Sequence, residues 1–249
     1  MLNVNINILK SRVSVNRSIT FYLHFFNFLC YTVYMTKAEI RNQIKETLNS
    51  PAVKDTLPSQ SEKICQTILE SKRYFSCTTL LAYMPLEDEV DIRPVINDAL
   101  SKGKKVYLPR IFPDTYNMEF YLYKAGNQTV SGSFGILEPS ENESQSFKKF
   151  LEKMSINEYS PAAHSSLFVE IDEPVQGIEH ILVLFPGRAF TKDGRRLGRG
   201  KGFYDTYFSH LPQIFDIKKS GVCFSEQLLP ELPTTPDDIM MDNVFSINV

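Results

Sequence analysis

The chain has 249 residues, of which 43% are hydrophobic and 22% are charged, so it can bury a sizeable core and is not generally disordered. Its formal net charge of −2, from 27 basic and 29 acidic side chains, argues against a globally basic nucleic-acid-binding protein. The four cysteines form no Cys-x-x-Cys pair, and the four histidines show no metal-ligand spacing. These patterns argue against a zinc finger, a thioredoxin-type site and a disulfide scaffold, and they are typical of a reducing compartment.

Residues 1–34 differ in composition from the rest of the chain. They contain three basic residues and no acidic one, which leaves a net charge of −5 for the remainder. A basic, partly apolar segment is typical of a presequence, but its apolar run includes His24 and Asn27, and no small-residue cleavage site follows. We therefore expect residues 1–35 to be an extension outside the domain, either absent from the working protein or acting as a presequence. The interrupted run does not predict a membrane anchor, so we expect no stable membrane association.

The first elements predicted after this segment are two helices. Thr36 and Glu39 form a Thr-x-x-Glu capping box, and apolar residues at i, i+4 and i+8 predict a helix over 37–48. Ser59 and Glu62 form a second box, which predicts the start of another helix with its apolar residues facing the core.

Strands and helices then alternate along the chain. An apolar run at 78–84 has the length of a strand and stops at Pro85. Asp91 can cap a helix that runs to about Leu100, and Gly103 ends that helix. The remaining predicted elements are strands at 105–108, 119–122, 180–185, 222–224 and 244–247, and helices around 146–154 and at 204–211.

This alternation predicts an α/β fold, with a single three-layer α/β/α domain over 36–249 and a largely parallel, mixed central sheet. The strand at 180–185 is apolar on both faces, as expected where helices cover both sides of a sheet. Residues 140–177 are polar and irregular, so we interpret them as a loop insertion in the domain.

The segment most informative about function follows this doubly apolar strand. There Gly198, Gly200 and Gly202 alternate with Arg199 and Lys201, and a helix is predicted directly afterwards. Glycines let backbone N–H groups turn toward an anion. Guanidinium and ammonium groups supply charge and hydrogen bonds to phosphate oxygens, and a helix start adds free N–H donors. A strand, this loop and a helix together therefore favour a phosphate-binding site.

Two familiar phosphate motifs do not match the loop. A P-loop needs a Gly where Arg195 stands and a Ser or Thr where Gly202 stands. In the dinucleotide fingerprint the third glycine comes later than it does here. From the pattern alone, a solvated basic loop and an RNA-contacting turn remain open as other interpretations.

Acidic residues lie on either side of this region. Asp205 falls in the first turn of the predicted helix, where a carboxylate ordinarily offsets the helix dipole. Beside bound phosphates, the same carboxylate is a suitable Mg²⁺ ligand. Asp237, Asp238 and Asp242 form a second acidic cluster, for which solvation of a loop is the ordinary interpretation.

The segment from Pro186 to Asp205 resembles the signature of the 5-formyltetrahydrofolate cyclo-ligase family, also called 5,10-methenyltetrahydrofolate synthetases. The resemblance is long and ordered, because Pro-Gly, Asp-Gly and Arg-Leu-Gly-Arg-Gly-Lys-Gly-Phe-Tyr-Asp follow one another. It extends over about 36–249. Further segments that resemble the family are Lys37 with Arg41, and residues 83–91, 108–110, 135–139 and 236–242.

The resemblance implies an ATP- and Mg²⁺-dependent conversion of 5-formyltetrahydrofolate to 5,10-methenyltetrahydrofolate, with release of ADP and phosphate. It implies phosphorylation of the formyl oxygen and ring closure by N10. The expected partners are small molecules, a reduced folate and ATP, and no nucleic acid. We expect a monomer or weak dimer in the cytoplasm, or in mitochondria if residues 1–34 act as a presequence.

The resemblance also implies roles for individual residues. Asp205 and Asp238 are expected to hold Mg²⁺. The expected catalytic residues are Arg199, Lys201 and Tyr204. The expected ATP-binding residues are Lys37, Arg41, Arg196, Leu197, Gly198, Arg199, Gly200, Lys201, Gly202, Phe203 and Tyr204. The expected folate-binding residues are Met84, Glu89, Arg199, Gly200, Lys201, Gly202 and Phe203. Without the resemblance, Glu89 is an exposed loop residue, and Lys37 and Arg41 are solvated helix residues.

The chain departs from the family pattern at a few positions. Phe203 stands where Tyr is frequent, and Arg188 and Thr191 replace the usual apolar and acidic residues, while some relatives have Gly at the position of Lys201. Two alternatives to the cyclo-ligase are a non-catalytic folate- or nucleotide-binding relative and an RNA-binding module. The net charge of −5 after residue 34 disfavours the RNA-binding module.

Overall fold

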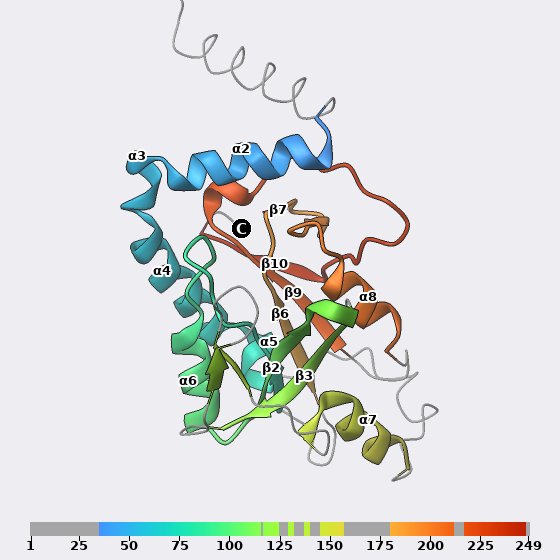
Figure 1. The fold of residues 1–249 in the computed structure, drawn as a ribbon. Helices are drawn as coiled ribbons and strands as arrows, with labels where there is room; N and C mark the ends of the chain where they lie inside the picture. The colour runs from blue at the N-terminus through green and yellow to red at the C-terminus, as the bar shows by residue number, and fades with distance from the viewer. Residues whose placement is uncertain are drawn as a thin grey trace, which may run out of the picture.

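A six-stranded sheet forms the middle of the molecule in this computed structural model, which describes residues 35–115, 117–124, 129–131, 137–139, 145–156, 180–211 and 217–247 (Figure 1). Its strands are β1 (Thr79–Leu81), β2 (Lys105–Phe112), β3 (Asn117–Tyr123), β6 (Ile181–Phe185), β9 (Ile217–Val222) and β10 (Asn243–Phe245). They lie in the order β10-β9-β6-β1-β2-β3, and every pair is parallel except β2 with β3. The sheet is therefore largely parallel and mixed, as predicted.

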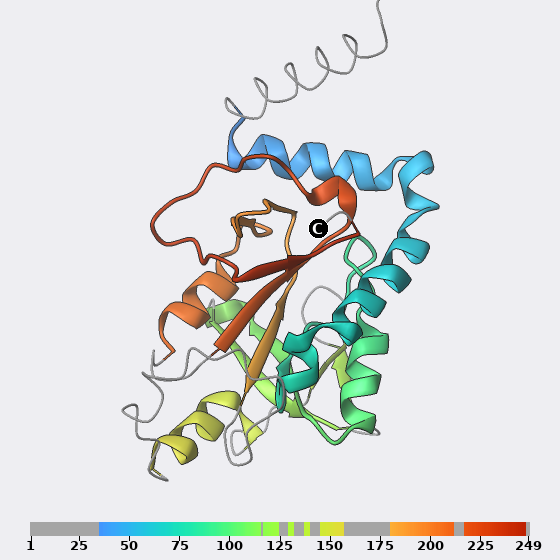
Figure 2. The same ribbon diagram turned by 180° about the vertical axis from the view of Figure 1, so that it is seen from behind.

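Helices cover both faces of this sheet (Figures 1 and 2). On one face, helix side chains such as Ile44, Ile64 and Val95 form one core cluster with residues of the central strands. On the other face, Phe147 and Phe208 belong to a second cluster. The helices of the first face are α2 (Lys37–Asn49), α3 (Pro51–Lys54), α4 (Leu57–Glu70), α5 (Lys72–Ser76) and α6 (Arg93–Ser101), and those of the second are α7 (Phe147–Ile156) and α8 (Phe203–Ser209).

The central strands explain why two cores form. Successive side chains of a strand point to opposite faces, so Leu80 and Leu182 join the first cluster while Leu81 and Val183 join the second. All residues of β6 are buried, which confirms the prediction of a strand covered on both sides. The predicted three-layer α/β architecture is confirmed.

The first helix begins where the sequence predicts it. Thr36 and Glu39 form a complete capping box, in which the backbone N–H of Thr36 donates to the Glu39 carboxylate at 2.7 Å. The second predicted box is wrong, because α4 begins at Leu57 and Ser59 lies inside its first turn. Pro58 accounts for the earlier start, since the fixed φ of proline suits the first turn of a helix.

The sequence predicts Asp91 as the cap of the next helix, but the cap is Ile92 and the helix begins at Arg93. The Asp91 carboxylate still accepts the Arg93 backbone N–H at 3.1 Å and pairs with the Arg93 guanidinium at 2.6 Å. Gly103 ends this helix region with a φ of 72°, a left-handed conformation that favours glycine.

Several strand boundaries differ from the prediction. β2 and β3 are longer than predicted because they pair with each other antiparallel over their whole length, from Val106 opposite Tyr123 to Phe112 opposite Asn117. β9 was predicted at 222–224 but ends at Val222. Its residues from Lys218 to Gly221 are polar or glycine, and they form a strand because β6 and β10 pair with β9 on its two sides.

The predicted helix around 146–154 is confirmed as α7. Most of the predicted insertion and residues 1–34 lie outside the described residues, so the domain boundaries stay predictions. Among the residues that are described, no helix has the length and apolar character needed to cross a membrane. Two small two-stranded sheets are also described: β4 (Thr129–Ser131) with β5 (Leu137–Pro139), and β7 (Ala189–Phe190) with β8 (Arg196–Leu197).

Candidate functional site

The predicted site residues gather where the strand order of the sheet reverses. β1 and β6 are parallel neighbours, but the chain continues from β1 to β2 on one side and from β6 to β9 on the other. In open α/β sheets, ligands bind outside the carboxyl ends of the strands at such a switch point. The segments that leave these two ends are 82–92 and 186–202, and both contain predicted site residues.

The Gly/Arg loop, residues 198–202, continues from the β7–β8 hairpin, which lies between α2 and the end of the sheet in Figure 1. The hairpin turn is closed by the Thr191 hydroxyl, which accepts the Arg195 backbone N–H at 3.0 Å. In the loop, Gly200 and Gly202 have φ values of 97° and 69°. Residues other than glycine rarely adopt a positive φ, so the course of the loop depends on these two glycines.

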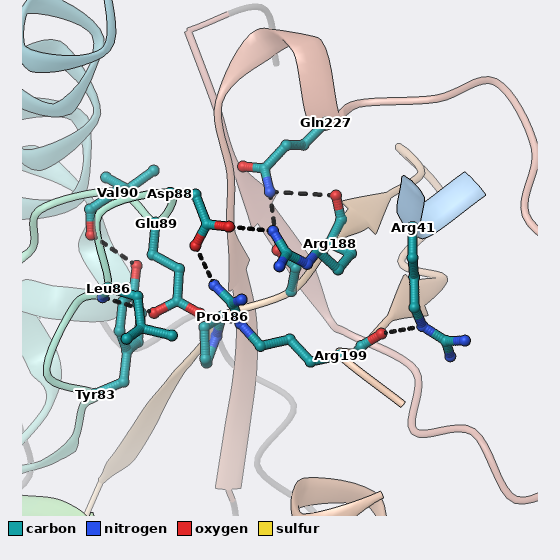
Figure 3. A network of polar contacts seen from close by, with 12 residues as sticks. Arg41, Tyr83, Leu86, Asp88, Glu89, Val90, Pro186, Arg188, Arg199 and Gln227 are labelled. Carbon is teal, nitrogen blue, oxygen red and sulfur yellow. Dashed lines mark hydrogen bonds and ion pairs between the residues drawn. The ribbon is translucent and has the colours of Figure 1, made fainter. Parts of the chain in front are cut away.

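Two arginines from the β6 side meet two carboxylates from the β1 side (Figure 3). Arg199 Nε donates to Glu89 Oε1 at 2.9 Å, and Asp88 forms ion pairs with both Arg199 and Arg188. The second oxygen of Glu89 accepts the Leu86 backbone N–H at 3.1 Å, which fixes this carboxylate in its turn. The ends of β1 and β6 are thus joined by charge-assisted hydrogen bonds, which are stronger than neutral ones.

The protonation states of this network follow from its geometry. Burial acts to raise the pKa of Asp88, but hydrogen bonds and charges from Arg199 and Arg188 outweigh it, and the pKa is lowered. Burial acts to lower the pKa of Arg199, but the charges and hydrogen bonds of Glu89 and Asp88 outweigh burial, and the pKa is raised. Burial, helped by the charge of Glu89, raises the pKa of Tyr204, so its phenol stays protonated and can act as a hydrogen-bond donor.

One face of α2 presents two cations to the same region. Arg41 Nε donates to the carbonyl oxygen of Gly198 at 2.8 Å, and Lys37 Nζ lies 2.9 and 2.6 Å from the two carboxylate oxygens of Asp238. Residues four apart share a helix face, so the Lys-x-x-x-Arg spacing brings both cations to this site, beside the row of Ile40 and Ile44 that packs in the core. The contacts of Lys37 and the Thr235 backbone outweigh burial and lower the pKa of Asp238.

The two predicted metal ligands line one cavity of about 770 Å³, which Gly202, Lys219 and Asp237 also line. Asp205 Oδ1 accepts hydrogen bonds from Arg196 Nη1 and the Ile239 backbone N–H, both at 3.3 Å. No group of three or more His, Cys, Asp or Glu side chains that could hold a metal ion occurs in the described ranges. Because Mg²⁺ is usually bound by one or two carboxylates plus phosphate oxygens, Asp205 and Asp238 fit an ion that arrives with a nucleotide.

The other predicted site residues differ in how they are placed. Arg196 is buried, with a side chain 5% exposed, and its Nε donates to the Pro186 carbonyl at 3.0 Å. Leu197 is a core residue, so only its backbone can face a ligand. Met84 and Phe203 are partly buried and pack against the two core clusters. Lys201 is exposed and makes no hydrogen bond or ion pair within the described part of the chain.

Sequence reasoning missed two residues of the network. From the sequence, Asp88 is not singled out within residues 83–91, and Arg188 is only a departure from an apolar position, yet the two residues form an ion pair. Each charge follows a central strand, at the carboxyl end of β1 or β6. A charged residue after each of two strands indicates an ion pair only when the two strands are known to be neighbours.

Comparison with known proteins identifies the family of the chain. The sequence model of the 5-formyltetrahydrofolate cyclo-ligase family matches residues 33–156 and 152–246. The mouse 5-formyltetrahydrofolate cyclo-ligase is 26% identical, with 86% of this chain and 95% of the relative covered. A probable 5-formyltetrahydrofolate cyclo-ligase of Schizosaccharomyces pombe is 29% identical, with coverage of 81% and 92%. A mitochondrial Arabidopsis thaliana cyclo-ligase is 27% identical, with coverage of 85% and 74%.

Solved structures show the same fold. The NMR structure of Aquifex aeolicus 5,10-methenyltetrahydrofolate synthetase is 25% identical with a TM-score of 0.60, and the match covers 84% of this chain and 89% of that one. A family match over most of the chain, with the signature residues at the carboxyl ends of β1 and β6, leads to one assignment. The chain belongs to the 5-formyltetrahydrofolate cyclo-ligase family of enzymes.

Proposed function

We propose that the chain converts 5-formyltetrahydrofolate to 5,10-methenyltetrahydrofolate, consuming ATP in the presence of Mg²⁺ and releasing ADP and phosphate. One observation carries this proposal: the Gly/Arg loop contacts Arg41 of α2 through the Gly198 carbonyl and, through Arg199, the Glu89 carboxylate that follows β1. Such a site can hold an anionic nucleotide beside a second substrate that has hydrogen-bond donors.

The chemistry needs charge neutralisation more than a strong base. The oxygen of an N-formyl group is a poor leaving group, so the γ-phosphoryl group of ATP is transferred to it and ADP is released. N10 then attacks the activated formyl carbon and gives up its proton, and the C–O bond breaks as phosphate leaves, which can carry that proton away. Positioning and electrostatic stabilisation are the main contributions that a protein makes to phosphoryl transfer.

In this proposal the basic residues contact the nucleotide. Lys37, Arg41 and the loop from Arg196 to Tyr204 bind the phosphates. Lys201, which has no ion-pair partner in the described residues, is available to a phosphate without losing another contact. Arg199, Lys201 and Tyr204 face the reacting atoms, with Tyr204 as a neutral donor. Arg199 exchanges part of its contact with Glu89 for substrate.

The folate would lie on the β1 side of the site. Glu89 is held in place by the Leu86 backbone, and its ionised carboxylate can accept hydrogen bonds from the donor edge of the pterin. Met84 provides an apolar contact nearby, and Arg199 to Phe203 contribute from the loop.

Asp205 and Asp238 would hold Mg²⁺, which neutralises phosphate charge when it is bound. Lys37 pairs with Asp238 and Arg196 pairs with Asp205, and these contacts hold the two carboxylates in place beside the cavity.

The proposal is tested by mixing the purified chain with 5-formyltetrahydrofolate and MgATP and following the near-UV absorbance of the methenyl product. A rise that requires both ATP and Mg²⁺, and that EDTA abolishes, supports it. A folded sample that gives no rise but binds ATP or the folate in calorimetry would instead indicate a non-catalytic binding relative.

Asp205→Asn is expected to lower kcat at least about tenfold, because the amide keeps the shape of the side chain but removes the charge that would hold Mg²⁺. The activity should also need more Mg²⁺ for half-saturation. The matched control is Asp237→Asn, an exposed neighbour in the same cavity wall, which should keep near-normal activity. Normal kinetics and normal Mg²⁺ dependence in a folded Asp205→Asn protein would reject the metal assignment.

Two further expectations stay proposals. The protein is a monomer or weak dimer with small-molecule partners. It acts in the cytoplasm, or in mitochondria if residues 1–34 are a presequence, and the name of the Arabidopsis relative includes a mitochondrial location.

A further inference from the structure

Arg188 has a fixed position at the end of β6. Its backbone N–H donates to the Leu197 carbonyl at 2.7 Å, and its carbonyl accepts from Gln227 Nε2 at 3.2 Å. Gln227 is itself buried and also binds the Gly187 carbonyl at 2.8 Å. The Arg188 side chain is only 12% exposed, so its guanidinium has little freedom to move.

Asp88 connects this fixed arginine to a less constrained one (Figure 3). Its Oδ2 pairs with Arg188 and its Oδ1 pairs with Arg199. Arg199 is 32% exposed and stands in the Gly/Arg loop, next to Gly200 with its φ of 97°. The backbone there does not define where the guanidinium lies, so its placement depends on Asp88 and Glu89.

The charges of the four groups balance. Arg188 and Arg199 offset Asp88 and Glu89 in a partly buried position, where charges are screened less than at the surface. Without Arg188, one guanidinium would face two carboxylates, and the site would gain a net negative charge where an anionic nucleotide has to bind.

Glu89 cannot serve as the permanent anchor of Arg199 if it binds the folate. Asp88 can take this role, because its position is set from the other side by Arg188. The pair Arg188–Asp88 therefore offers Arg199 a fixed partner while Glu89 exchanges its contact for substrate.

We propose that Arg188 is a positioning residue, which acts through Asp88 to hold Arg199 at the reacting centre. This inference rests on the proposed function, because it concerns the same site.

The test compares variants in the methenyl-product assay. Arg188→Leu is expected to lower kcat about tenfold and to change the KM of either substrate less than about threefold, because Arg199 is most important in the transition state. Arg188→Lys keeps the charge and should recover most of kcat. Asp88→Asn should lower kcat similarly, and the double variant should lose no more than Asp88→Asn alone, since Arg188 acts through that carboxylate.

Lys102→Leu is the matched control. It also replaces a cation by leucine and breaks an ion pair, with Asp98, but it lies at the far end of α6 and should keep normal kinetics. Thermal unfolding of every variant shows whether the fold is retained. A folded Arg188→Leu protein with kcat within about twofold of the wild type would overturn the inference, as would single losses that multiply in the double variant. Wild-type protein without turnover would reject the proposed function itself.

Discussion

Replacing Arg196 with alanine is expected to lower kcat roughly 100-fold, because one side chain supports several parts of the site. Its guanidinium donates to the Pro186 carbonyl at 3.0 Å, pairs with Asp205 at 3.3 Å and lies over the rings of Phe185 and Tyr204 at 5.5 and 5.2 Å. Alanine would leave the carbonyl without this donor and Asp205 without its counter-charge. Steady-state kinetics of the methenyl-product assay measures the loss.

The same variant is expected to be less stable by about 1–3 kcal/mol, since buried polar groups lose their partner. Arg195→Ala is the control, because Arg195 is the preceding residue and pairs at the surface with Asp193. That variant should retain both its stability and its activity. If Arg196→Ala keeps kcat within about threefold of wild type, the role assigned to Arg196 in the site is wrong.

Gly194→Ala is expected to destabilise the fold by about 3–5 kcal/mol, for two reasons that act together. The φ of Gly194 is 91°, and a Cβ added there would lie 2.2 Å from the carbonyl oxygen of Met241. The backbone cannot relax easily, because the Met241 N–H donates to the Gly194 carbonyl at 2.8 Å. Denaturant unfolding of the purified chain measures the change.

Gly103→Ala provides the comparison for this prediction. Its φ of 72° is also left-handed, but an added Cβ would meet nothing within 4 Å. It should cost only the conformational strain, about 1–2 kcal/mol. Equal destabilisation by both substitutions would show that the contact with Met241 does not contribute to the loss of stability.

Because Met241 follows the segment that includes Asp238, Gly194→Ala should also reduce activity.

Local features of the fold were predictable from short stretches of sequence. The capping box of Thr36 and Glu39 and the doubly buried strand β6 depend on neighbouring residues or on the apolar pattern, and both are confirmed. β9 was misplaced because its polar residues become a strand only between β6 and β10. The helix start at Ser59 was wrong because a nearby proline outweighed the capping pattern.

The candidate site was predictable as a set of residues but not as a set of partners. The Gly/Arg loop indicated phosphate binding from composition and spacing, because glycine conformations and basic side chains act locally. The ion pair of Lys37 with Asp238 joins residues 201 positions apart, and that of Arg188 with Asp88 joins residues 100 apart. No spacing rule relates such positions.

The sequence by itself determined the alternation of strands and helices, the glycines that shape the loop, and the family to which the loop is similar. Only the tertiary structure decided that β1 and β6 are neighbours, and therefore which charges meet at their ends. The physical reason is that strand pairing and the burial of both sheet faces are properties of the whole chain. Asp88 and Arg188 acquire a role only when that packing brings them together.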